Sequence, residues 1–346
     1  MNAIKLFVVD DSAVVRQSIS KLVEDETDIE ILGVASDPIF AMEKFKKLGL
    51  PDVLILDVEM PRMNGIDFLK KIMSETPIAT IICSSVTKLG SFEAKEIHKA
   101  GAFALVEKPN LQTKEFIEQS KENFINVIKS ASKAKLKIIK NTDIKIDKSK
   151  SKTENKIVNS KKVIAIGSST GGVQVLEKIL TSLVKDTVPI MITQHMPAGF
   201  TASLANRLDN ICKLNIRQAE DGDELQNSTV YIAQGDKHMF LEKRGLKYII
   251  KIQDGPKVSH HRPSVDILFK SFAKELGSYG VGIILTGMGS DGAKGLKEMF
   301  NVGAKTYAQN EDSCVVYGMP NEAVKLGGVT HSLSIGKIIE TIQSIR

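Results

Sequence analysis

The sequence predicts an α/β protein with two domains, each built on a doubly wound, mainly parallel sheet. Its 346 residues are enough for two hydrophobic cores. Short apolar runs alternate with amphipathic, helix-like stretches in both halves of the chain, as parallel sheets with crossover helices require. A lysine-rich segment without a sustained apolar pattern separates the two halves. We therefore expect a first domain at 1–125, a flexible linker at 126–160 and a second domain at 161–346.

The positive charge of the chain is concentrated near this linker. The net charge is +6, but the stretch from Lys129 to Lys162 holds 12 lysines and only three acidic residues, so the rest carries −3. Lys, Ser, Asn and Thr dominate the stretch, which is typical of a solvated tether. A nucleic-acid-binding arm is the alternative interpretation, but the stretch has no aromatic residue for stacking and no recognition motif. We expect no nucleic-acid partner.

Cysteine content and hydropathy indicate the cellular compartment. The three cysteines, Cys83, Cys212 and Cys314, show no paired spacing, so neither a disulfide framework nor a zinc ribbon is predicted. The chain reaches Asp10 and Asp11 before any signal-like apolar core develops, and no later run approaches the roughly 20 apolar residues of a membrane span. We expect a soluble cytoplasmic protein without membrane insertion.

Five apolar runs predict the strands of the first domain. They lie at 5–11, 29–36, 52–58, 78–85 and 102–109, with amphipathic stretches such as 14–25 between them. Ligands of parallel sheets bind beyond the carboxyl ends of the strands. The polar residues at those ends are Asp10, Asp11, Asp57, Ser84 and Lys108.

Three carboxylates at one sheet edge repel one another unless a cation lies among them, and Mg²⁺ favours carboxylate and phosphate oxygens. This set therefore predicts a magnesium-assisted phosphate site. Any one of these acids could instead close a strand as a turn residue. The coincidence of five such positions favours the site.

On these residues, the segment at about 4–122 resembles the receiver domain of two-component response regulators. The resemblance implies that Asp57 accepts a phosphoryl group from a histidine kinase. It also implies that Asp10 and Asp11 bind Mg²⁺ together with Asp57, that Lys108 pairs with the phosphoryl oxygens, and that Ser84 is the switch hydroxyl. Leu105 stands where receivers often carry an aromatic residue, so the usual aromatic switch is in doubt.

The second domain opens with "VIAIGSSTGGVQVLEKIL", the pattern of a strand, a glycine-rich turn and a helix. A phosphate loop would need lysine where Val173 stands, and the dinucleotide fingerprint does not fit either. The turn does fit G-x-S-x-G at 167–171, which makes Ser169 a candidate nucleophile. Small residues are common in tight turns, so the motif alone is weak and needs a base and an orienting acid.

His195 and Asp291 are the candidate partners of Ser169. His195 closes the apolar run at 189–195, so it should emerge at the same sheet edge as the serine, whereas a structural role is the alternative for any single histidine. Asp291 follows the apolar run and glycine-rich turn of 281–292, where it could also serve as the N-cap of the next helix. The three would form an acyl-transfer triad, in a chain order that differs from that of α/β-hydrolases.

Residues from about 160 to 346 closely resemble the catalytic domain of bacterial chemotaxis protein-glutamate methylesterases. The matching stretches include "IGSSTGG", "ITQHMPAGFT", "HRPSVD", "LTGMGSDG" and "AQNEDSCVVYGMP". The resemblance implies that Ser169 is the nucleophile, His195 the general base and then acid, Asp291 the orienting acid, and the backbone N–H of Met288 an oxyanion donor. Ser168 and Ser290 stand where the family commonly has alanine and asparagine; a hydroxyl at 168 could alter the hydrogen bonding of Ser169.

The implied substrates are glutamate γ-methyl esters on helical cytoplasmic segments of chemoreceptors, hydrolysed with release of methanol, and certain receptor glutamines, deamidated with release of ammonia. These steps need no metal, so Mg²⁺ belongs to the receiver.

The order of the domains suggests that the unmodified receiver covers the serine's cleft and shifts when Asp57 is phosphorylated. A non-catalytic receiver scaffold is the alternative function. A DNA-binding regulator is disfavoured, because no helix-turn-helix pattern follows the linker.

Overall fold

The computed structural model describes residues 3–84, 96–97, 100–108, 121, 124–125, 127–132, 162–196 and 198–345. The chain divides into two compact units, Met1–Asp143 and Ile144–Arg346. No helix within the described residues has both the length and the apolar character needed to cross a membrane.

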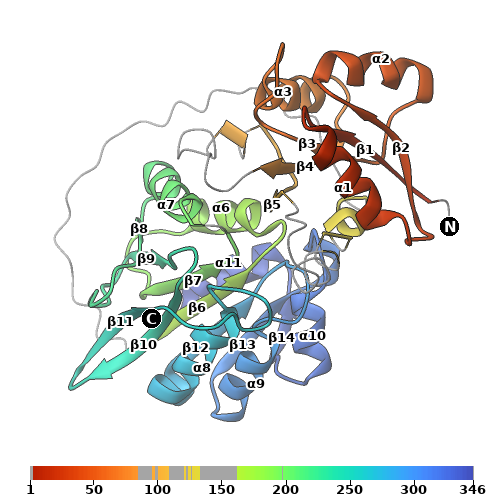
Figure 1. The fold of residues 1–346 in the computed structure, drawn as a ribbon. Helices are drawn as coiled ribbons and strands as arrows, with labels where there is room; N and C mark the ends of the chain where they lie inside the picture. The colour runs from red at the N-terminus through yellow and green to blue at the C-terminus, as the bar shows by residue number, and fades with distance from the viewer. Residues whose placement is uncertain are drawn as a thin grey trace. The chain divides into compact units, whose positions relative to one another are not determined.

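The first unit contains a five-stranded sheet in the order β2-β1-β3-β4-β5, in which every neighbouring pair is parallel (Figure 1). The strands are β1 (Ile4–Val9), β2 (Ile29–Ala35), β3 (Val53–Leu56), β4 (Ala79–Ser84) and β5 (Ala104–Glu107). The crossover helices described in full are α1 (Ala13–Val23), α2 (Pro38–Leu48) and α3 (Gly65–Glu75). The five predicted strands and their parallel arrangement are therefore confirmed.

Each of these three helices begins at a side-chain cap. Ser12, Asp37 and Asn64 accept hydrogen bonds from backbone N–H groups of the first turn of α1, α2 and α3, which would otherwise lack partners. Fully buried side chains such as Phe7 in β1 and Phe68 in α3 then join helices and sheet in one core. Because caps and core fix where each strand ends, the polar residues that follow the strands meet at one edge.

The linker predicted at 126–160 includes residues that pack in the first unit. Residues 127–131 are helical, with Val127 and Ile128 buried. Lys129 forms ion pairs with Glu26 at 2.8 Å and Asp28 at 3.0 Å. Residues 126 and 133–160 of the predicted linker lie outside the described residues.

The second unit contains a seven-stranded sheet in the order β14-β13-β12-β6-β7-β9-β8, again with only parallel pairs. Its strands are β6 (Val163–Ser168), β7 (Ile190–Gln194), β8 (Asn215–Gln218), β9 (Thr229–Ile232), β12 (Gly280–Ile284), β13 (Lys305–Gln309) and β14 (His331–Leu333). An antiparallel hairpin, β10 (His238–Arg244) and β11 (Lys247–Gln253), is separate from this sheet. The prediction of two mainly parallel sheets is confirmed.

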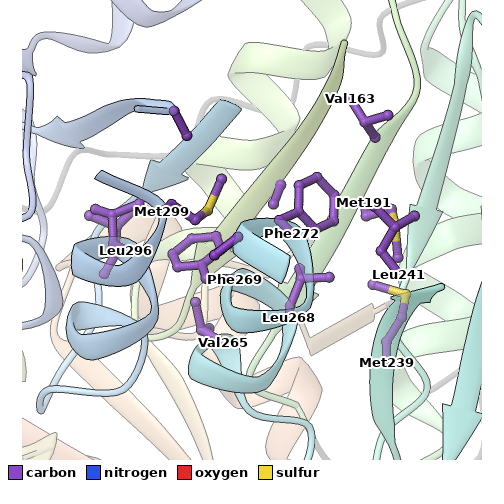
Figure 2. Close-up of a cluster of buried hydrophobic side chains, with 14 of the residues drawn as sticks. Val163, Met191, Met239, Leu241, Val265, Leu268, Phe269, Phe272, Leu296 and Met299 are labelled. Atoms are coloured by element: carbon purple, nitrogen blue, oxygen red, sulfur yellow. The ribbon is translucent and has the colours of Figure 1, made fainter. Parts of the chain in front are cut away.

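Helices cover both faces of the second sheet (Figure 1). They are α6 (Gly172–Ser182), α7 (Phe200–Ile211), α8 (Val265–Leu276), α9 (Ala293–Asn301), α10 (Met319–Lys325) and α11 (Ile335–Ser344). In β6, Ile164 and Ile166 pack in the core shared with α6, α7 and α11, whereas Val163 and Ala165 pack in the core shared with α8, α9 and α10 (Figure 2). This alternation assigns each strand residue to one face, and so places the residues at the strand ends.

Candidate functional site

The acidic residues of the first unit meet at one sheet edge, as predicted. Asp10 follows β1 and Asp57 follows β3, the neighbouring strand, where the Asp57 N–H donates to the carbonyl of Val9 at 2.9 Å. Asp10, Asp11 and Asp57 each offer a carboxylate oxygen, and these oxygens lie within 4.8 Å of one another. A set of three carboxylates, two buried and one exposed, fits a hard cation such as Mg²⁺ that retains bound water.

Lys108 closes this site from β5. Its backbone N–H donates to the Ser84 carbonyl at 3.2 Å, and its Nζ lies 2.8 Å from a carboxylate oxygen of both Asp10 and Asp57. Burial raises the pKa of Asp57, and the charge of Asp10 adds to this, while Lys108 opposes it. Burial would lower the pKa of Lys108, but its bonds to the two carboxylates outweigh that effect and raise it. The edge therefore holds competing charges that a cation or phosphoryl group would rebalance.

The ends of β6 and β7 bring Ser169 and His195 together in the second unit. The parallel register pairs Ser168 with Gln194, the last residues of β6 and β7. Ser169 and His195 are therefore the first residues after these two adjacent strands. The Ser169 N–H donates to the carbonyl of Thr286 at 3.1 Å, which adds the end of β12 to the site. A Cβ at Gly287 would lie 2.8 Å from the Ser169 Cβ, so glycine is required for this approach.

The turn after Ser169 has the geometry that the G-x-S-x-G interpretation requires. Gly171 adopts a φ of 76°, in the left-handed region that residues with a Cβ rarely occupy, and α6 begins at the next residue. Ser169 is half-buried, in contrast to the fully buried Ser168 before it. The sharp turn thus exposes the central hydroxyl of the motif.

Asp291 accepts hydrogen bonds from His195 and from the N-terminus of a helix. Its Oδ2 lies 2.8 Å from His195 Nε2 and accepts the Val265 N–H at 2.7 Å. Its Oδ1 accepts the Ser264 hydroxyl at 2.7 Å and the Asp266 N–H at 3.1 Å. Asp291 therefore receives the first N–H groups of α8, and the alternative that it caps the helix following it is wrong, because Gly292 is the N-cap of α9.

The charge of Asp291 determines the proton positions on His195. Burial alone would raise the pKa of Asp291, but the hydrogen bonds from His195, Ser264 and Val265 hold it below its ordinary value. An ionised carboxylate only accepts, so Nε2 of His195 carries a proton and Nδ1 of the neutral ring is free to accept one. Nδ1 is buried and has no hydrogen-bond partner in the described part of the chain.

Ser168 contacts Gln194 rather than the hydroxyl of Ser169. Its hydroxyl donates to Oε1 of Gln194 at 2.7 Å, and Nε2 of Gln194 donates to the carbonyls of Ser169 and His195 at 3.0 and 3.1 Å. The Gln194 amide thus joins the segments that follow β6 and β7, just beyond the last residue pair of these strands. Sequence reasoning missed Gln194, although a polar residue at a buried strand position must find partners and its place before His195 was a signal.

Met288 follows Gly287 in the loop beside Ser169. The backbone N–H of Gly287 donates to Val316, and its carbonyl accepts the N–H of Gly318 and of Met319. The Met288 N–H, by contrast, has no hydrogen-bond partner within the residues that the structure describes. It is therefore available to a ligand, while the neighbouring Ser290 is exposed.

Of the other histidines that the structure describes, His261 contacts the ring of His195. His238 is buried, with Nε2 2.9 Å from the Pro256 carbonyl and Nδ1 accepting the Ser264 N–H at 3.3 Å, so its role is structural. His98 lies outside the described residues, and His331 is exposed in β14. His261 stacks on His195 with ring centroids 3.7 Å apart. Sequence reasoning missed this contact, because 66 residues separate the two rings.

Comparison with known proteins gives a family for each of the two units. Residues 164–342 match the family model described as CheB methylesterase, and residues 6–120 match that of the response regulator receiver domain. A protein-glutamate methylesterase/protein-glutamine glutaminase of Leptospira interrogans is 49% identical over 98% of this chain and 99% of its own length. A relative with that name in Geobacter metallireducens is 44% identical over 99% of each chain. The crystal structure of the Thermotoga maritima CheB methylesterase catalytic domain, 38% identical, covers 55% of this chain and 100% of its own, with a TM-score of 0.53.

The fold and the matches define the class of protein: a response regulator whose receiver domain is joined to a hydrolase domain. The chain belongs to the CheB methylesterase family.

Proposed function

We propose that this chain demethylates glutamate γ-methyl esters and deamidates specific glutamines on the cytoplasmic helical segments of chemoreceptors. The proposal includes a cytoplasmic location, a receiver domain at 1–125 and a catalytic domain at 161–346. It also includes a linker at 126–160, of which residues 127–131 form a helix that packs in the first unit. The observation that carries it is the 2.8 Å contact of His195 Nε2 with Asp291. This contact leaves Nδ1, which has no partner among the described residues, as an acceptor beside the strand-end Ser169.

The catalytic cycle has two halves. Nδ1 of His195 takes the proton of Ser169 as its Oγ attacks the ester carbonyl, and Asp291 stabilises the imidazolium through Nε2–H. The Met288 N–H donates to the developing oxyanion. His195 then gives this proton to the methoxy oxygen as its bond to the carbonyl carbon breaks, and methanol leaves. Water, activated by the same base, hydrolyses the glutamyl-enzyme and restores a glutamate carboxylate. A glutamine amide enters the same cycle and releases ammonia.

In the receiver domain, Asp57 accepts a phosphoryl group from a chemotaxis histidine kinase. Asp10, Asp11 and Asp57 would hold Mg²⁺, which neutralises charge on the phosphoryl oxygens. Lys108 pairs with those oxygens, and the Ser84 hydroxyl is the switch group. The 2.8 Å contacts of Lys108 with two of the carboxylates support its assignment.

Methanol release from membranes that contain methylated chemoreceptors tests the proposed function. The full-length protein, with Mg²⁺ and a small phosphodonor, should release methanol, and Ser169→Ala should release at least about 1,000-fold less, as expected for loss of a covalent nucleophile. Ser168→Ala is the matched control, since it removes the neighbouring hydroxyl, and it should retain most of the activity. Equal release by the parent and Ser169→Ala would overturn the assignment, and no release by the parent would favour a receiver scaffold.

A further inference from the structure

The imidazole of His261 lies against the proposed general base. Its ring centroid is 3.7 Å from that of His195, and the two ring planes are inclined by 12°, so the rings are stacked face to face. Within the described residues, the His195 ring is otherwise held by one hydrogen bond, from Nε2 to Asp291. The torsion that turns a histidine ring has broad minima, and one hydrogen bond to the ring edge leaves the tilt of the plane unrestrained. A second ring lies on that face, in a position to restrain the tilt.

The turn that presents His261 has a strained backbone. Val258 and His261 exchange two backbone hydrogen bonds of 3.0 and 2.9 Å. The two residues between them, Ser259 and His260, have φ values of 50° and 66°. A two-residue turn of this kind normally carries asparagine, aspartate or glycine, because a Cβ is disfavoured at positive φ. Such strain persists only where the surroundings hold the chain in place.

Two side chains, Arg262 and His238, hold the segments on either side of this turn. Arg262 donates to the Gly255 carbonyl at 2.6 Å and to the Asp236 carboxylate at 2.8 and 3.0 Å. The buried His238 binds the Pro256 carbonyl on one side and the Ser264 N–H on the other. These contacts fix the position of the loop next to the site.

We propose that His261 is a positioning residue: its ring holds the imidazole of His195 in the plane that joins Nε2 to Asp291 and leaves Nδ1 for Ser169. This inference rests on the proposed function. It assigns a role to a residue that makes no hydrogen bond to the triad.

The protonation state of His261 is compatible with this role. The titratable and charged groups that act on it are His195, Asp291, His260 and Lys257. Burial, followed by the charge of His195, lowers the pKa of His261 to about 3, so the ring is neutral at physiological pH. A neutral π face can lie beside the imidazolium that His195 becomes during the reaction, whereas a second imidazolium would repel it.

The test compares His261→Phe, which keeps a stacking ring without titratable nitrogens, with His261→Ala, in the full-length protein. For Ser169-dependent methanol release, His261→Ala should lower kcat about 10- to 100-fold with KM within about twofold, because misplaced catalytic groups cost rate rather than binding. His261→Phe should recover kcat to within about threefold of the parent. His260→Asn removes the adjacent, exposed imidazole, and asparagine tolerates positive φ, so this variant should have the kcat of the parent.

An equal kcat loss in His261→Ala and His261→Phe, or a parental kcat in His261→Ala, would overturn the inference. Nitrogen NMR of ¹⁵N-labelled histidine reports the tautomer of His195 independently of turnover. Melting temperatures of the variants verify that they are folded. The parent and His261→Phe should show the single Nε2-protonated tautomer, and His261→Ala a mixture; the same single tautomer in all three would contradict the inference. If the parent releases no methanol, the proposed function fails, while the tautomer comparison still decides the role of His261.

Discussion

At the scale of single residues, the site depends on where protons lie. The Asp291 carboxylate accepts four hydrogen bonds, one of them from His195 Nε2. The Ser-His-Asp sites of serine proteases use the opposite assignment, with Nδ1 bonded to the aspartate and Nε2 facing the serine. The chemistry is the same in both cases, because each nitrogen of a neutral imidazole can take either role.

Asp291→Asn should inactivate the enzyme without unfolding it. An asparagine amide can donate to Nε2, which favours the tautomer that is protonated at Nδ1 and unable to accept the Ser169 proton. We expect kcat to fall by about 10⁴-fold, the loss that a matching substitution causes in a serine protease. Steady-state methanol release with a parallel melting curve checks this, and a loss below about tenfold would contradict the role given to the carboxylate.

The pH dependence of stability should separate Asp291 from its neighbour Asp266. The pKa of Asp291 lies below its ordinary 3.8, so its contribution to stability is present above that value and is lost as pH falls through the lower folded-state pKa. Burial raises the pKa of Asp266, with the charge of Asp291 adding to it, so protonation of Asp266 favours the folded state as pH falls.

Between pH 5 and 3, Asp291→Asn should therefore lose stability less steeply than the parent, and Asp266→Asn more steeply. Denaturant unfolding at a series of pH values measures both slopes. Slopes that change in the same direction in the two variants would contradict the opposite pKa shifts.

At the scale of elements, the N-termini of α8 and α9 are joined by reciprocal hydrogen bonds, in which a carboxylate at the start of each helix accepts backbone N–H groups of the other. Asp291, which precedes α9, accepts N–H groups of α8, and Asp266 in the first turn of α8 accepts the Gly295 N–H of α9 at 2.7 Å. The helix dipole of α8 adds to these bonds in favouring the Asp291 charge. Asp291, the proposed orienting acid, is thus bonded to the first turn of α8 and lies directly before the N-cap of α9.

Ser264→Ala tests this arrangement. The Ser264 hydroxyl donates to Asp291 and accepts the Ile267 N–H at 3.4 Å, so its loss should cost about 1 to 2 kcal/mol of stability and lower kcat several-fold. Ser334→Ala removes a comparable N-cap from α11, at an exposed position that makes no contact with the site. It should reduce stability without changing kcat, and an equal fall of kcat in both variants would contradict the role of Ser264 in holding Asp291.

At the scale of the whole molecule, each unit carries a site at the carboxyl edge of its own parallel sheet. Periodicity predicted those edges, because strand ends in a parallel sheet lie together whatever the details of packing. Gln194, His261 and Ser264 were beyond such reasoning. Each acts through a contact with a distant part of the chain, and only the folded structure shows which segments meet. The capping role of Asp291 was attributed to the wrong helix for the same reason.

Regulation should depend on the site around Asp57 in the first unit, and catalysis on the site around Ser169 in the second unit. Asp57→Asn should abolish the increase in methanol release that a small phosphodonor causes in the parent, because the phosphoryl acceptor is lost. Chelation of Mg²⁺ from the parent should remove the same increase and leave the basal, Ser169-dependent release in place. A fall of basal release to the Ser169→Ala level on chelation would contradict the assignment of the metal to the receiver alone.

Covalent labelling of the serine shows whether His195 activates the hydroxyl of Ser169. A fluorophosphonate forms a stable phosphorus–oxygen bond with an activated serine and releases fluoride, and peptide mass spectrometry identifies the serine that carries the adduct. We predict one adduct in the second unit, on Ser169, with a labelling rate that falls at least about 100-fold in His195→Ala, the range expected for loss of a general base. An adduct on Ser168, or an equal labelling rate in His195→Ala, would contradict this activation of Ser169.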